Sequence, residues 1–124
     1  PEVTPAHRQS WQRVFSQRIP GGPLDCGFDD YFGVDIPNWP PFCFIEGDRT
    51  VGIPSEFLPP EKRVKNQASV GGPALPGWTL EPNLPRLVDR SIEFIQRQAQ
   101  EQKPFLTYIA LTTPHTPLAV NEPW

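Results

Sequence analysis

The sequence predicts an α/β fold, and two neighbouring segments near the end of the chain carry this prediction. Residues 85–102 have the apolar spacing of an amphipathic helix, and residues 105–111 form an almost unbroken apolar and aromatic run. A run of this length is too short to span a membrane and is typical of a parallel strand covered on both faces. Helix 85–102 and strand 105–111 together predict one αβ unit of a mostly parallel sheet.

The helix expected over residues 85–102 has recognisable ends. Asn83 is a good capping residue, Pro85 suits a first turn because its missing N–H needs no partner there, and Pro104 stops the helix before the strand. The apolar face should pack on the sheet and the polar face should meet water. The apolar face contains Leu84, Val88, Ile92, Ile95 and Ala99, and the polar face contains Arg90, Glu93, Arg97, Gln100 and Glu101.

A second, shorter helix is predicted near the start of the chain. Trp11, Val14 and Phe15 follow helical spacing, and Ser10 is a candidate cap for the first turn. Prolines and glycines in residues 20–23 should end this helix.

The middle of the chain predicts a small hairpin followed by a long loop. Residues 42–46 and 50–53 flank a turn over residues 46–49 and read as two short strands. Residues 54–82 combine several prolines with Gly71, Gly72 and Gly77 and show no sustained period. We expect a largely irregular excursion there.

Composition supports long ordered loops and excludes some classes of partner. The 124 residues include 18 prolines, about three times the usual ~5% share, and the hydrophobic content is 37%. We therefore expect loops that lie over a larger body. The net charge of −3 gives no basic footprint for nucleic acid. No apolar segment approaches the ~20 residues of a membrane-spanning helix.

His115 is the candidate active-site residue. It follows the carboxyl end of strand 105–111, where ligands bind in open α/β sheets, and it lies between Pro114 and Pro117. The prolines restrict the backbone, so the loop should present the imidazole from a fixed position. The alternative is an ordinary loop histidine that binds a neighbouring carbonyl group or faces water.

Three blocks of the sequence, in order, resemble the sulfatase family of formylglycine-dependent sulfuric ester hydrolases. Residues 22–33 (GPLDCGFDDYFG) resemble its G-P-x-D-x-GFD-x-FFG signature. Residues 40–52 (PPFCFIEGDRTVG) resemble PPY-x-FIE-x-DR-x-VG, and the segment KPFLTYIALTTPHTP at 103–117 is similar to KPFFLYL-x-x-x-x-PH-x-P.

This resemblance implies an alkaline-phosphatase-like sulfatase domain that hydrolyses sulfate monoesters of aryl groups or carbohydrates. It implies a formylglycine nucleophile, a divalent metal, usually calcium, and a histidine at His115 that contacts the sulfate or its leaving group. It also implies an exported protein, periplasmic, extracellular or lysosomal. The oligomeric state is left open.

Several family motifs are missing from the sequence. Neither Cys26 nor Cys43 lies in the C/S-x-P-x-R motif that is converted to formylglycine, and the family's metal ligands and GKWH-type motif are absent. We therefore expect residues 1–124 to be an internal, incomplete part of a single sulfatase catalytic domain, inactive alone. The alternatives are a non-catalytic sulfatase-like fragment and a phosphate or phosphonate ester hydrolase of the same superfamily.

Two further groups have both a functional and a structural interpretation. An acidic cluster of Asp25, Asp29, Asp30 and Asp35 could bind a metal, but its spacing favours turn capping. Cys26 and Cys43 could form a disulfide in an exported protein or remain free thiols.

Overall fold

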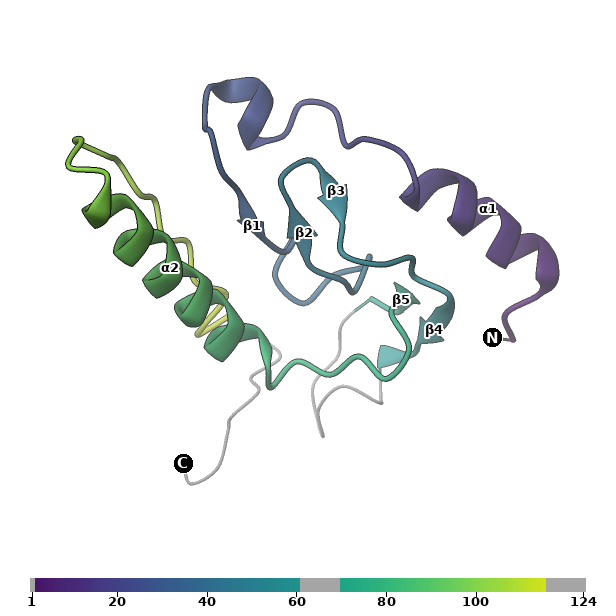
Figure 1. Cartoon of the computed structure of the whole chain (residues 1–124). Coiled ribbons are helices and arrows are strands. Elements are labelled where there is room, and N and C mark those ends of the chain that lie inside the picture. The colour runs from purple at the N-terminus through teal and green to yellow at the C-terminus, as the bar shows by residue number, and fades with distance from the viewer. Residues whose placement is uncertain (1, 61–69, 116–124) are drawn as a thin grey trace.

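The chain combines two helices with two small antiparallel sheets in a computed structural model that describes residues 2–60 and 70–115. In Figure 1, α1 and α2 lie on opposite sides of the short strands. The mixed α/β class is therefore confirmed, whereas the sheets of the described residues are antiparallel. The elements are α1 (Pro5–Phe15), η1 (Pro23–Cys26), β1 (Phe32–Gly33), β2 (Ile45–Glu46), β3 (Arg49–Thr50), β4 (Glu56–Leu58), β5 (Gly72–Ala74) and α2 (Asn83–Gln100).

Helix α1 begins earlier than the sequence predicts. Its cap is Thr4, whose hydroxyl accepts a hydrogen bond from the His7 backbone N–H at 3.2 Å, while His7 Nδ1 accepts one from the Thr4 N–H at 3.3 Å. This reciprocal arrangement satisfies two N–H groups that helix formation leaves without partners. Ser10 lies inside the helix and is not its cap, because Thr4 followed by Pro5 is the stronger start signal.

The hairpin predicted around residues 46–49 is confirmed as β2 and β3. Ile45 pairs with Thr50 and Glu46 with Arg49, and Gly47 supplies the positive φ of 61° that the tight turn requires. Strand β1 adds to the free edge of β2, which completes a three-stranded antiparallel sheet.

Residues 54–82 are less irregular than expected. Strands β4 and β5 pair in antiparallel register, with Glu56 opposite Ala74 and Leu58 opposite Gly72. On its other side β5 is joined to Phe42, whose N–H donates to Pro73 O at 2.8 Å. Because these pairing partners are distant in sequence, they leave no local hydrophobic period, and the sequence pattern therefore does not predict the strands. Residues 61–69 lie outside the described residues.

A small apolar core forms where the two sheets and the start of α2 meet. Its buried members are Phe42, Cys43, Ile45, Ala74, Leu80 and Leu87. Beside it Phe44 stacks on Phe32 with ring centroids 5.1 Å apart and meets Trp78 at 5.0 Å. The aromatic residues among the prolines thus pack loops onto the sheets.

Helix α2 is confirmed, but it contacts the sheet through a different face from the one predicted. The Arg90 guanidinium lies 4.7 Å from the Phe32 ring centroid and pairs with Glu46, and Arg97 pairs with Asp30 at 2.5 Å. Both arginines were expected to meet only water. Val88, Ile92 and Ile95, expected to pack on the sheet, are instead exposed, and Asn83 is the buried first residue of the helix instead of its cap.

Residues 105–111 do not form the predicted strand. The segment runs back along α2 (Figure 1), and Phe105 meets Phe94 edge-on with ring centroids 5.9 Å apart. No strand pairs with it among residues 2–60 and 70–115, and Leu106 and Tyr108 are each 79% exposed. A strand needs a hydrogen-bonding neighbour, and the described part of the chain supplies none. The expectation of burial on both faces is therefore wrong for this chain by itself.

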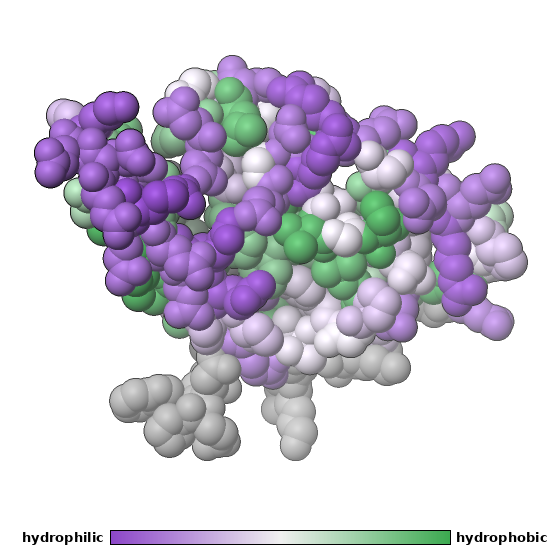
Figure 2. Space-filling model, in the orientation of Figure 1, coloured by the Kyte–Doolittle hydropathy of each residue, from purple (hydrophilic) through white to green (hydrophobic). Residues whose placement is uncertain are grey.

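Several apolar residues of α2 and most of those in segment 105–111 are consequently exposed to solvent. Figure 2 shows hydrophilic colour over most of the α2 face turned to the viewer, with hydrophobic colour emerging along its edge. We call the set Val88, Ile92, Ile95, Phe105, Leu106, Tyr108, Ile109 and Leu111 the open apolar face.

Candidate functional site

His115 lies in a tight turn directly after the apolar segment. Its backbone N–H donates to Thr112 O at 3.0 Å, and Thr112 is buried whereas His115 is exposed. The turn therefore anchors the peptide at one end and leaves the imidazole on the surface, where a substrate could reach it.

Asn38 is hydrogen-bonded to the His115 backbone on the other side of the His115 Cα. Its Nδ2 donates to His115 O at 3.1 Å, across 77 positions of sequence, and its side chain is buried. Asn38 has a φ of 63°, in the left-handed region that asparagine tolerates better than most residues. Sequence analysis did not identify Asn38; the signal that was available is an asparagine between Pro37 and Trp39, a common turn composition.

A shallow polar hollow lies beside this turn. Its volume is about 10 Å³, close to the minimum that holds one water molecule. Asn83 is only 4% exposed, and its Oδ1 has no hydrogen-bond partner among the described residues. The hollow is lined by Asn38, Leu80, Glu81, Asn83, Leu84, Thr112, Thr113 and His115. It offers amide, hydroxyl and imidazole groups but is too small to enclose an ester by itself.

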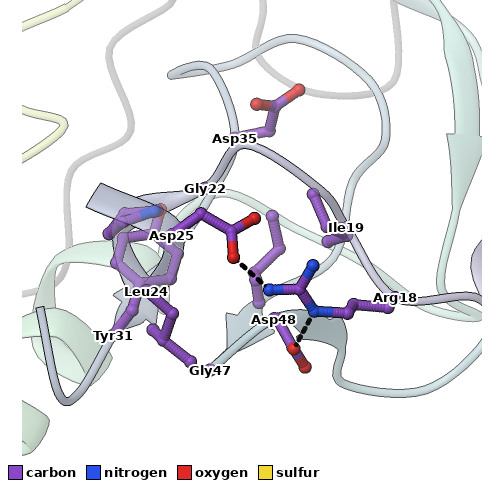
Figure 3. Close-up of a pocket in the computed structure, with 11 residues that line it drawn as sticks. Arg18, Ile19, Gly22, Leu24, Asp25, Tyr31, Asp35, Gly47 and Asp48 are labelled. Atoms are coloured by element: carbon purple, nitrogen blue, oxygen red, sulfur yellow. Dashed lines mark hydrogen bonds and ion pairs between the residues drawn. The ribbon is translucent and has the colours of Figure 1, made fainter. Parts of the chain in front are cut away.

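A larger cavity of about 80 Å³ lies between η1 and the β2–β3 hairpin. Figure 3 shows the Arg18 guanidinium between the carboxylates of Asp25 and Asp48. Arg18 Nε donates to Asp48 Oδ2 at 2.7 Å and Nη2 donates to Asp25 Oδ1. The Gly21 N–H also donates to Asp25 Oδ2, at 2.7 Å. The pKa of the Asp25 carboxyl is lowered, first by the bond from Arg18 and then by that from Gly21.

We call Arg18, Asp25 and Asp48 the arginine clasp. It ties the segment after α1 to η1 and to the hairpin, and the Ile19 N–H adds a backbone hydrogen bond to Asp48 O at 2.8 Å. Because both carboxylates are already paired with Arg18, the clasp is a structural feature. The acidic cluster behaves accordingly: Asp25 and Asp30 form ion pairs, and the described residues bring no three potential ligands together around a metal position.

Of the two alternatives for Cys26 and Cys43, the structure shows free thiols. Cys26 is exposed, and Cys43 is buried in the core. Burial, assisted by Asp35, raises the pKa of the Cys43 thiol to about 11. A thiol held in its neutral form is a poor nucleophile, so Cys43 has a packing role.

Searches for similarity give no match to a family model, a curated protein or a solved structure. Within the described residues, neither helix is long and apolar enough to cross a membrane.

Proposed function

We propose that residues 1–124 are an internal part of a sulfatase catalytic domain, in which His115 contacts the sulfate ester or its leaving group. The observation that carries the proposal is the position of His115: an exposed histidine, hydrogen-bonded through its backbone on both sides of its Cα, beside a small hollow. The resemblance of residues 22–33, 40–52 and 103–117 to the sulfatase family supports sulfate ester hydrolysis as the reaction.

The chemistry of sulfate ester hydrolysis suits an imidazole at this place. Negative charge spreads over the non-bridging oxygens and builds on the leaving oxygen in the transition state. An imidazole N–H aimed at those oxygens stabilises the charge as it develops, and one such fixed donor is worth a factor of roughly 10²–10³ in rate. In the complete enzyme, formylglycine would supply the nucleophile and calcium the Lewis acid. We place both of these groups outside residues 1–124.

The open apolar face gives a second, independent argument for the same proposal. Isolated soluble domains rarely leave a contiguous apolar surface of this kind uncovered. Residues 105–111 have the composition of an interior strand, and a strand of this type is stable only between neighbours. A longer catalytic domain would provide those neighbours and would place His115 near the remaining active-site groups. An exported location follows from the same proposal.

The test uses the longer polypeptide that contains residues 1–124. We expect a C/S-x-P-x-R motif before residue 1 and calcium-dependent release of nitrophenol from nitrophenyl sulfate. Faster release from nitrophenyl phosphate, together with a serine or threonine nucleophile, would show the phosphate ester hydrolase instead. Release from neither ester, with the motif absent, would show a non-catalytic relative. Aryl and carbohydrate sulfates compared side by side would then define the substrate class.

A further inference from the structure

We propose that Asn38 is a positioning residue for His115. The inference rests on the proposed function, because it assigns Asn38 a role through His115. The Asn38 Nδ2 donates to His115 O at 3.1 Å, while the His115 N–H donates to Thr112 O at 3.0 Å. The backbone is therefore bonded on both sides of the His115 Cα.

The two residues that bind the His115 backbone are themselves buried. Asn38 and Thr112 are each 7% exposed, so both anchors of the His115 peptide lie away from bulk water. This hydrogen bond is partly buried, and such a bond is electrostatically stronger than one in water. The turn thus holds the backbone from which the imidazole projects before substrate arrives, and a backbone fixed in advance lowers the reorganisation needed during reaction.

The backbone of Asn38 narrows the choice of residue at this position. Its φ of 63° is accessible to glycine, asparagine and aspartate at low cost. Among these three, only asparagine has an N–H donor on its side chain. Asn38 therefore meets two requirements at once, a left-handed turn and an amide aimed at the carbonyl oxygen of His115.

Glycine and aspartate, the other two residues that tolerate this φ, give two informative variants. Asn38→Gly keeps the left-handed backbone and removes the amide, and Asn38→Asp keeps the shape but places an acceptor opposite the His115 carbonyl. Gln102→Gly is the matched control, because Gln102 is also a non-glycine residue with positive φ, at 53°, and is exposed after α2. All three are made in the longer polypeptide, with His115→Ala as a fourth variant.

We expect Asn38→Gly to lower kcat on nitrophenyl sulfate about tenfold while KM changes less than twofold, because the site is still present but less well oriented. Asn38→Asp should lower kcat at least as far, and Gln102→Gly should leave it unchanged. Hydrogen exchange of the peptide containing residues 112–115 should accelerate in Asn38→Gly and not in Gln102→Gly.

The outcomes separate this inference from the proposed function. If His115→Ala lowers kcat but Asn38→Gly does not, Asn38 has no positioning role. Unchanged exchange over residues 112–115 in Asn38→Gly would overturn the inference as well, whatever the activity. If His115→Ala hydrolyses the ester as fast as the unaltered protein, the proposed function itself fails, and the role of Asn38 in catalysis fails with it.

Discussion

Some single residues of this chain stabilise the fold, and others are exposed to solvent and can react or bind. Cys43 and Asn38 are buried, whereas Cys26, at the end of η1, and His115, in the turn after segment 105–111, are exposed. Arg18 belongs to the first group although it is partly exposed, because it joins two carboxylates from different segments.

The two cysteines should react at very different rates. At pH 8 we expect iodoacetamide to label Cys26 and to spare Cys43. The pKa of Cys43, about 11, leaves little of its thiol as thiolate at this pH, and its burial keeps the reagent away from the sulfur. Peptide mass mapping measures the labelling, and unfolding in urea should make the two rates similar. Rapid labelling of Cys43 in the folded longer polypeptide would contradict the structure.

The raised pKa of Cys43 also sets a direction for alkaline stability. The folded state holds the thiol proton more tightly than the unfolded state does, so this contribution is fully present below pH 9. It is lost as the pH rises from about 9 through about 11. Cys43→Ala should therefore show a smaller loss of stability over that window than the unaltered chain does.

The arginine clasp should respond to acid. The pKa of Asp25 is lowered by Arg18, so its contribution is present above the ordinary carboxyl pKa near 3.8 and is lost as the pH falls through the folded value. We expect Arg18→Gln to accelerate hydrogen exchange of residues 16–21 at pH 7, and to remove most of the acid-induced acceleration. Arg13→Gln, an exposed change in α1, is the control, and equal exchange in the two variants would refute the clasp.

Among the elements, α2 and segment 105–111 show what local pattern determines and what it does not. The spacing of apolar residues identified α2 within two residues at each end, because helix formation depends on neighbours three and four positions away. Which face packs inward depends on the partner. Here Arg90 and Leu87 lie on the side of β1, while Ile92 lies away from it.

Strands were harder to predict because they depend on distant pairing. The β2–β3 hairpin has its partner two residues away and was found, whereas β4 and β5 have partners beyond residues 61–69 and were missed. Segment 105–111 has the composition of a strand without a neighbour to pair with. The prediction of His115 as a site residue rests on its place after an apolar run. Asn38 has no such local signal, since it meets His115 through a contact across 77 positions.

The open apolar face of α2 should be covered in the longer polypeptide. Ile92 is 47% exposed in the present chain, so we expect Ile92→Lys to lower the thermal midpoint of the longer polypeptide by several degrees, since a buried unpaired charge is costly. Gln12→Lys, at an exposed position of α1, is the matched control. Equal midpoints for the two variants would show that this face stays in water.

At the scale of the whole molecule, a small core is combined with many exposed apolar side chains. The core consists of a few side chains around Phe42 and Cys43, whereas α2 and segment 105–111 leave the large apolar side chains of the open apolar face exposed. Such surfaces favour association or partial unfolding.

We therefore expect residues 1–124, expressed alone, to bind a hydrophobic dye, to unfold without a cooperative near-ultraviolet circular dichroism transition, and to release no sulfate. Calorimetry should show no tight calcium binding, since we place those ligands outside this chain. Cooperative unfolding together with sulfate release from nitrophenyl sulfate would mean that no further segments are needed.

The central claim is that His115 acts on a sulfate ester, and turnover of nitrophenyl sulfate by the longer polypeptide with His115→Ala tests it most directly. The account predicts that kcat falls at least tenfold, as for a fixed donor to the developing charge, while the thermal midpoint is unchanged because the exposed imidazole packs little. An unchanged kcat in a folded variant would contradict the account.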